Sequence, residues 1–195
     1  MDLAFDAEQG ASDEVLLIAY GNGDASAARI LMMRLTPRIM GFAARLLGGD
    51  RAEAEDVTQE AMLRLWKIAP DWRQGEAKVS TWLYRVVSNL CTDRLRKTKS
   101  VDLDSIAEPE DDSASAEEGL QSAARMAALD QALAELPERQ RHAVVMRHIE
   151  GLSNPDIAAV MDIGVEAVES LTARGKRALA AILAGRRAEL GYEDD

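Results

Sequence analysis

The sequence predicts an all-α protein made of two small helical domains joined by an acidic linker. Apolar residues recur at three- and four-residue spacing, and no segment alternates apolar and polar residues as a half-buried strand does. Aromatic residues are only 4% of the 195 residues, whereas the helix formers Ala, Leu, Arg and Glu are frequent. Residues 100–119 carry eight acidic side chains and no Lys or Arg, which favours a flexible linker. We therefore divide the chain into a first domain (1–99), a linker (100–124) and a second domain (125–190).

The first part of the first domain contains clear helix boundaries. Ser12 and Asp24 are suitable N-caps, and the sequence Gly21-Asn-Gly separates the two helical patterns that follow them. Pro37 predicts the start of a further helix, because proline is favoured in a first turn. The pair Gly48-Gly49 predicts the end of that helix.

The next helix is expected from Asp50 to about Ile68, where Pro70 stops it. Asp50 and Glu53 have the spacing of a capping box. Two stripes run along this helix at the spacing of one helical face. The apolar stripe consists of Val57, Ala61, Leu65 and Ile68, and the other consists of Asp56, Gln59, Glu60 and Leu63.

A polar loop, residues 71–78, precedes a helix that we expect Ser80 to cap and that reaches about Arg96. Its core-facing residues are expected to be Leu83, Val87, Leu90, Cys91 and Leu95. The opposite face is polar and basic, with Arg85, Asn89, Thr92 and Arg96. A solvated surface is one interpretation of this face.

The second domain has the pattern of a helix-turn-helix. A helix is expected from about Arg125 to Leu136, and another from Glu138 to Ile149, ended by Gly151. Ser153 caps a short helix, and a turn at Asp162 leads to a last helix near Val165. One side of that helix carries Val165, Val168, Thr172, Gly175, Leu179 and Ile182, and the other carries Glu166, Glu169, Ser170, Ala173, Arg174 and Arg177.

The net charge of −11 is distributed unevenly. Residues 1–23 carry five acidic and no basic side chains, and residues 100–124 carry eight and none. Residues 24–99, by contrast, hold 14 Lys or Arg against 9 Asp or Glu. Because salt screens charges beyond about 10 Å, binding to a polyanion depends on the local field. The basic first domain is therefore compatible with DNA binding despite the acidic total.

The composition argues against several classes of protein. No apolar run approaches the roughly 20 residues of a membrane span, and the N-terminus lacks the basic start of a signal peptide, which predicts a cytoplasmic protein without membrane insertion. Cys91 is the single cysteine, so no intramolecular disulfide forms within one chain, and its apolar neighbours favour a buried thiol over a redox sensor.

Enzyme signatures are also lacking in the sequence. It contains no glycine-rich phosphate loop and no nucleophile elbow. His142 and His148 have no cysteine or second histidine at metal-ligand spacing, so structural or surface roles are favoured. We expect no catalytic residue, no metal, no cofactor and no small-molecule substrate, and hence no enzyme.

Two segments, in this order, give the sequence its clearest resemblance. The first runs from Asp50 through Ala-Glu-Asp-Val-Thr-Gln-Glu to Trp66 and is followed by a helix beginning Trp82-Leu-Tyr-Arg. The second comprises Leu136-Pro-Glu-Arg-Gln-Arg and Glu150-Gly-Leu-Ser-Asn-Pro-Asp-Ile-Ala-Ala. Together they resemble the extracytoplasmic-function (ECF) sigma factors of the sigma-70 family, which carry bacterial RNA polymerase to promoters. The resemblance covers roughly residues 24–99 and 125–185 and implies a region 2-like bundle followed by a region 4-like helix-turn-helix.

The resemblance implies a docking surface for core RNA polymerase. Carboxylates on the helix after Asp50 would pair with basic residues on the clamp helices of the largest subunit, and a leucine would add apolar contact. The residues concerned are Asp56, Gln59, Glu60 and Leu63. The flap region of the polymerase is a second implied partner. The alternative is an ordinary solvated acidic face.

The resemblance also implies two DNA surfaces. The loop after Trp72 lies where members of the group hold a base extruded from the -10 element, and the following basic face would touch phosphates and the duplex edge. This implied -10 surface contains Trp72, Arg73, Gln74, Gly75, Lys78, Arg85, Asn89 and Arg96. Trp82 is expected in the core.

The last helix would enter the major groove of the -35 element. Its implied DNA-facing residues are Glu166, Glu169, Ser170, Ala173, Arg174 and Arg177. Relatives often read Thr-Val-Lys-Ser-Arg in this helix, whereas this chain has Glu169 and Leu171 at the positions of the Lys and the Arg. These differences remove two phosphate contacts, although Glu169 can accept a hydrogen bond from a cytosine amino group.

Further implications concern partners. An anti-sigma protein is expected from the resemblance, and the acidic linker is either a plain tether or a segment that follows the nucleic-acid path through the polymerase. Two other functions fit parts of the sequence: a sigma-like module that titrates an anti-sigma protein, and a helix-turn-helix repressor. The repressor leaves the acidic segment from Asp56 to Trp66 without a purpose.

Overall fold

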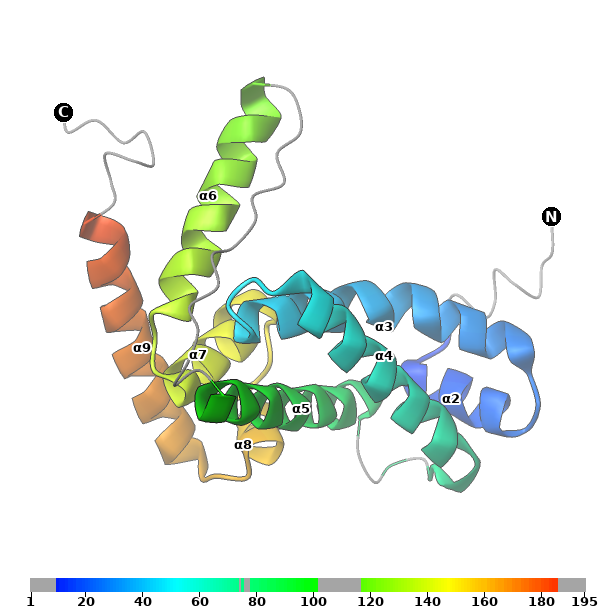
Figure 1. Ribbon diagram of the computed structural model, residues 1–195. Helices are drawn as coiled ribbons and strands as arrows, with labels where there is room; N and C mark the ends of the chain where they lie inside the picture. Colours follow the sequence, from blue (N-terminus) through cyan, green and yellow to red (C-terminus); the bar gives the residue numbers. More distant parts are fainter. Residues whose placement is uncertain (1–9, 74, 76–77, 102–116, 186–195) are drawn as a thin grey trace.

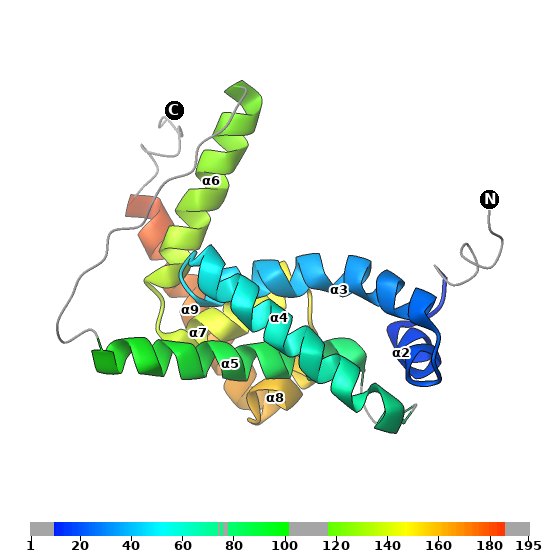
Figure 2. The ribbon, with the colours of Figure 1, turned by 45° about the vertical axis from the view of Figure 1, so that its right-hand side comes forward.

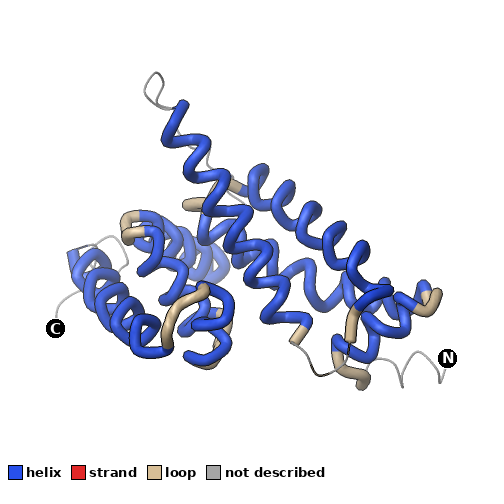
Figure 3. Tube along the Cα trace, turned by 90° about the horizontal axis from the view of Figure 1, so that it is seen from below, coloured by secondary structure: helices blue, strands red, loops and turns tan. Residues whose placement is uncertain are grey.

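The computed structural model describes residues 10–73, 75, 78–101 and 117–185 (Figure 1). Over these residues Figure 3 shows helices joined by turns and no strand, which confirms the predicted all-α class. We call residues 10–101 the first unit and residues 117–185 the second unit. Most of the predicted linker, 102–116, lies outside the described residues, as does Gln74 of the -10 surface.

The first unit contains four α-helices and one 3-10 turn. They are α2 (Asp13–Gly21), α3 (Ala25–Leu46), α4 (Arg51–Ile68), the turn η1 (Ala69–Asp71) and α5 (Val79–Val101). Three predicted N-caps are confirmed, because Ser12, Asp24 and Asp50 each accept a backbone N–H of the first turn. The α3, α4 and α5 helices pack on one another, and α2 packs on α3 and α5, so that the acidic stripe of α4 and the basic face of α5 belong to one helical bundle.

The prediction that a helix starts at Pro37 is wrong, because Pro37 lies inside α3. A proline in a helix interior costs about 3 kcal/mol through its missing N–H and its clash with the preceding turn. Here the apolar stripe continues unbroken on both sides, through Leu31, Leu35 and Ile39, all buried. Pro37 itself is exposed, so water can satisfy the carbonyl that loses its partner. Burial of the stripe therefore outweighs the local penalty.

The α5 helix begins at Val79, so Ser80, the expected N-cap, lies inside its first turn. The N–H of Val79 donates to the carboxylate of Glu14 at 3.1 Å, so a side chain of α2 satisfies the start of α5. The helix also continues past Arg96 to Val101. Among its expected core residues, Leu83, Val87, Leu90 and Cys91 are buried.

The second unit contains α6 (Glu117–Ala134), α7 (Glu138–Val144), a π-helical turn η2 (Val145–Ile149), α8 (Asn154–Met161) and α9 (Val165–Gly185). The helix expected to start near Arg125 begins eight residues earlier at Glu117, because acidic residues favour a helix N-terminus and the following segment is rich in alanine. Ser153 caps α8, and Asp162, at the predicted turn, adopts the left-handed conformation with φ 53° and ψ 52°.

Close packing of α7 and α9 sets the geometry of the helix-turn-helix. A Cβ atom at Gly175 would lie 2.6 Å from Val144 Cγ2 and 3.1 Å from the carbonyl oxygen of Gln140. Glycine therefore allows the two helices to approach closely. Val168 and Gly175 of the predicted apolar side of α9 are buried, but Val165 at its start is 39% exposed, because it precedes the contact with α7.

The two units pack against each other through α5. Figure 2 shows α5 lying between α4 of the first unit and α8 of the second, in agreement with the helix contacts. One continuous cluster of buried apolar side chains extends through both units. This arrangement places the helix-turn-helix beside the predicted DNA face of α5, on which Arg85, Asn89 and Arg96 stay exposed.

Candidate functional site

The predicted polymerase surface lies on α4 and faces solvent. Leu63 is 61% exposed, which is unusual for a leucine in a helix whose opposite side is fully buried. Asp56 and Gln59 are exposed and Glu60 is half-buried. The structure therefore brings the four predicted residues together on one accessible face, with an apolar side chain among carboxylates.

Arg94 of α5, which the sequence analysis did not single out, borders this surface. It donates a hydrogen bond to Glu53 and forms ion pairs with Asp56 and Glu60, both at 3.9 Å. Glu60 also pairs with Arg64 on the same helix. The acidic stripe is thus partly neutralised from within the first unit. No local sequence signal reveals Arg94, because the partners lie on a different helix.

The loop part of the predicted -10 surface combines exposed and packed residues. Arg73 and Gly75 are exposed, and Gly75 has φ +90°, a conformation that favours glycine. Trp72 is half-buried and packs edge-to-face on Trp82, with ring centroids 6.3 Å apart. The buried indole N–H of Trp72 has no hydrogen-bond partner within the described residues. Trp82 packs against the core, as predicted.

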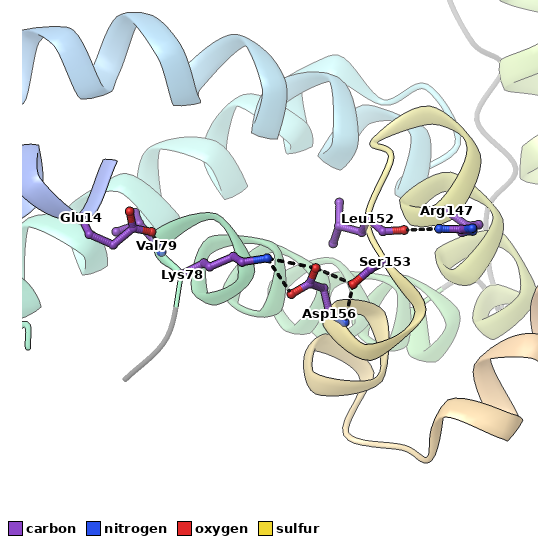
Figure 4. Close-up of polar contacts among 7 residues, drawn as sticks. All are labelled: Glu14, Lys78, Val79, Arg147, Leu152, Ser153 and Asp156. Carbon is purple, nitrogen blue, oxygen red and sulfur yellow. Dashed lines mark hydrogen bonds and ion pairs between the residues drawn. The ribbon is translucent and has the colours of Figure 1, made fainter. Parts of the chain in front are cut away.

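The helical part of the predicted -10 surface meets the second unit. Lys78 Nζ lies 3.3 Å from both carboxylate oxygens of Asp156, and Arg85 lies 3.8 Å from Asp162. Figure 4 shows Lys78 reaching across to Asp156, whose carboxylate also accepts the hydroxyl of Ser153 at 2.6 Å. Asn89 and Arg96 are exposed. Two cations predicted to contact DNA are therefore paired with carboxylates of α8 and the turn that follows it.

The predicted -35 surface is formed by the solvent side of α9. All six predicted residues are exposed: Glu166, Glu169, Ser170, Ala173, Arg174 and Arg177. Asn154, at the start of α8, donates to Glu169 at 3.4 Å, a contact that the sequence analysis did not anticipate. Arg174 and Arg177 each donate to the backbone carbonyl four residues earlier, at 3.3 Å. The acidic residues occupy the first half of the face and the arginines the second half.

A basic cluster lies beside this surface. His148, Arg147 and Lys176 are exposed, and partial burial together with the nearby charges of Lys176 and Arg147 lowers the pKa of His148. Arg147 also donates to the carbonyl of Leu152 at 2.9 Å, which ties η2 to the loop before α8 (Figure 4). The cluster extends the positive charge of Arg174 and Arg177.

Burial shifts the pKa values of two titratable side chains, Cys91 and His142. Burial raises the pKa of the Cys91 thiol to about 12, as expected for an inert buried cysteine. His142 is buried and its pKa is lowered to about 4 by burial. Across the described ranges, no group of three or more potential ligands is placed to hold a metal ion. In the same part of the chain, no helix is long and apolar enough to cross a membrane.

Comparison with known proteins assigns both units to families. A family model described as Sigma-70 region 2 matches residues 31–101, and one described as Sigma-70, region 4 matches residues 126–179. The first match covers α5 and α4, and the second covers the helix-turn-helix. Together they account for more than half of the chain, in the order that the sequence analysis expected.

Whole-chain relatives agree with these matches. The ECF RNA polymerase sigma factor SigM of Mycobacterium tuberculosis is 35% identical over 175 residues, 88% of this chain and 85% of SigM. The RNA polymerase sigma-H factor of Pseudomonas aeruginosa is 32% identical over 178 residues, 86% of this chain and 91% of that factor. The solved structure of CnrH in complex with the cytosolic domain of CnrY has a TM-score of 0.65 at 25% identity and covers 90% of this chain and 99% of CnrH. The chain therefore belongs to the extracytoplasmic-function sigma factors of the sigma-70 family and acts with RNA polymerase in transcription initiation.

Proposed function

We propose that the exposed face of α4 is the surface by which this sigma factor docks on the clamp helices of core RNA polymerase. The observation that carries this proposal is the exposure of Leu63 among Asp56, Gln59 and Glu60 on a helix that is otherwise well buried. An apolar anchor surrounded by charge is the usual composition of a specific protein interface. The carboxylates would attract the basic surface of the polymerase as the two proteins approach. On binding, their ion pairs with Arg94 would be replaced by ion pairs with basic residues of the polymerase.

The first unit would then open the -10 element. The loop containing Arg73 and Gly75 would hold an extruded base, and Arg85, Asn89 and Arg96 of α5 would contact the strand and the duplex edge. The exposed side of α9 would read the -35 element, with Arg174 and Arg177 on phosphates and Glu169 at a base edge. The region 4-like unit would also contact the polymerase flap.

The remaining assignments follow from this role. The protein would work in the cytoplasm, where the polymerase is, and would catalyse no reaction itself. Since the solved relative CnrH is bound to the cytosolic domain of CnrY, we propose that an anti-sigma protein binds this chain and controls it. The acidic linker would run beside the nucleic-acid path of the polymerase.

A charge reversal on α4 tests the docking surface. Asp56→Lys should weaken the affinity for purified core polymerase about tenfold or more, because it places a cation against basic partner residues. Glu55→Lys is the matched control, since Glu55 is exposed on the same helix and the change in charge is identical. Equal affinities of the two variants, measured by fluorescence anisotropy, would remove α4 from the polymerase interface.

A further inference from the structure

The solvent face of α9 is divided by charge along its length. Its first half, residues 165–173, contains the carboxylates of Glu166 and Glu169 and no Lys or Arg, whereas Arg174 and Arg177 lie in the second half. In a helix-turn-helix, the first residues of the recognition helix contact base edges. Arginines are suited to phosphates, which position the protein without reading sequence. Base contacts made by the first half of α9 therefore rely on acidic or uncharged side chains.

Glu169 is held by a residue of the preceding helix. The side-chain amide of Asn154, the first residue of α8, donates to Oε1 of Glu169 at 3.4 Å. Glu169 is exposed and Asn154 is half-buried. The α8 and α9 helices pack against each other, so the donor and the acceptor belong to one helix pair. One carboxylate oxygen of Glu169 is thus bound, and the other can accept a hydrogen bond from outside the protein.

Asn154 itself has a well-defined place. Ser153 caps α8 by accepting the N–H of Asp156 at 3.3 Å, and its hydroxyl donates to the Asp156 carboxylate at 2.6 Å (Figure 4). Pro155 follows in the first turn and restricts the backbone. Because the donor is fixed, its hydrogen bond limits the rotamers of Glu169 before DNA binds. This lowers the entropy that Glu169 would lose on contact with a base.

The chemistry of a carboxylate limits the bases that it can recognise. An ionised carboxylate only accepts hydrogen bonds. In the major groove, guanine presents the acceptors N7 and O6 and thymine presents the acceptor O4, so both repel it. Adenine presents the N6 amino donor beside the acceptor N7, whereas cytosine presents the N4 amino donor without a neighbouring acceptor. Cytosine is therefore the base that best fits Glu169.

We propose that Asn154 is a positioning residue that holds Glu169 for one cytosine of the -35 element. This inference rests on the proposed function of α9 and adds the base that the helix selects. Glu169 receives the N4 amino group of that cytosine, while Arg174 and Arg177 bind the nearby phosphates. The chain therefore prefers a C·G pair at one position of the element.

A simpler effect of Glu169 is general repulsion of DNA. A carboxylate near phosphates weakens binding to every sequence, and its removal strengthens binding to all of them by a similar factor. Base recognition instead changes the ratio between sequences. The test is therefore the preference at one position, measured on a mixture of promoters, rather than a single affinity.

Selection from a promoter library measures this preference. Core polymerase with the full chain is incubated with fragments randomised upstream of the -10 element, and the bound fragments are sequenced. For the wild type, we expect about tenfold enrichment of C at one upstream position. Glu169→Gln should replace C by A there, because glutamine pairs with N6 and N7 of adenine. Glu135→Gln, at an exposed glutamate of the same unit outside α9, is the matched control and should leave C enriched.

Asn154→Asp tests the positioning role. It removes the donor and places a second carboxylate beside Glu169, so the enrichment of C should fall about threefold or more. Aspartate is favoured in the first turn of a helix, so the fold should be kept, which circular dichroism would verify. In the Glu169→Gln background, the same change supplies an acceptor for the glutamine amide, and the enrichment of A should not fall. Equal losses of selectivity in both backgrounds would overturn the role of Asn154.

The same selection separates this inference from the proposed function. If the wild type enriched an upstream element that Glu169→Gln left unchanged, α9 would keep its -35 assignment and the cytosine contact would be wrong. A uniform gain in binding to all sequences would likewise reduce Glu169 to a repulsive charge. If the wild type enriched no upstream position at all, the -35 assignment of α9 would fail, and this inference with it.

Discussion

At the residue scale, His142 is a titratable group buried at the contact between the units. Its Nδ1 lies 3.0 Å from Ser88 Oγ of α5, and its pKa is lowered from 6.5 to about 4 mainly by burial, with Arg141 acting in the same direction and Glu138 against it. The folded chain therefore holds His142 neutral, whereas an exposed imidazole takes up a proton near its ordinary pKa. Unfolding is consequently coupled to protonation of His142.

We predict that acid weakens the folded state through His142. The lowered pKa gives full stability above about pH 6.5 and progressive loss as pH falls toward about 4, with a total on the order of 3 kcal/mol. The free energy of urea unfolding between pH 7.5 and 4.5 measures this. His142→Gln should flatten the dependence in this window, and His148→Gln, which changes the exposed histidine, should retain it. An identical pH dependence in all three proteins would contradict the assignment.

Gly175 offers a second test at this scale. We expect Gly175→Ala to destabilise the second unit by about 1–3 kcal/mol, because its Cβ would lie 2.6 Å from Val144 Cγ2 and force α7 and α9 apart. Gly185→Ala, at the end of the same helix with open space around it, is the control and should change little. Chemical denaturation followed by circular dichroism would measure both. Equal free energies of unfolding for the two variants would mean that α7 and α9 accommodate the added methyl group without loss of stability.

At the element scale, α5 has two separate tasks on adjacent faces. Tyr84, Ser88 and Thr92 hold the second unit, whereas Arg85 and Asn89 remain exposed beside them. We predict that Arg85→Ala with Asn89→Ala lowers the yield of open promoter complexes severalfold while core binding changes less than twofold, because phosphate and base contacts act after docking.

Permanganate footprinting of the melted segment measures promoter opening, and a separate binding assay measures the affinity for core polymerase. Arg29→Ala is the matched control, since Arg29 is an exposed arginine on α3 away from this face. Open-complex yields equal to the wild type would exclude α5 from promoter opening. A parallel loss of core binding would instead indicate that the face belongs to the polymerase interface.

The helices themselves were largely predictable because their boundaries are local. Ser12, Asp24 and Asp50 cap the helices that follow them, and a cap requires only a side chain and the next few backbone N–H groups. The helix start predicted at Pro37 and the N-cap predicted at Ser80 were wrong, because tertiary contacts determine where these helices begin. The start of α5 at Val79 depends on Glu14, 65 residues earlier, and no local pattern contains that information.

At the scale of the whole molecule, the sequence predicted which residues lie on each candidate surface but not how the two units contact each other. The stripe on α4 and the face of α9 follow from helical periodicity, and both are exposed as expected. The contact of Lys78 with Asp156 joins residues 78 positions apart across two units. Such pairings form when helices pack against each other, and the apolar pattern of each helix is compatible with many packing arrangements. The spacing of residues along the sequence therefore cannot identify them.

Packing of the two units makes a prediction about cooperativity. Trp66, Trp72 and Trp82 all lie in the first unit, so tryptophan fluorescence reports that unit, whereas far-ultraviolet circular dichroism reports every helix. Since one apolar cluster passes through both units, we expect the two signals to give coincident urea transitions in the wild type at low salt. Transitions that already differ in the wild type would show that the units unfold independently.

Tyr84→Phe should separate the two transitions. The substitution removes the hydroxyl that donates to Glu150 and leaves that half-buried carboxylate with Arg45, at 3.9 Å, as its partner. We expect this to weaken the contact between the units by about 1–3 kcal/mol. The second unit, which lacks tryptophan, should then unfold at lower urea than the fluorescence midpoint. Tyr20→Phe is the control, because Tyr20 packs on Trp66 within the first unit. If both phenylalanine variants kept coincident transitions, the apolar contacts would be sufficient to couple the units, and the polar row on α5 would serve to orient them.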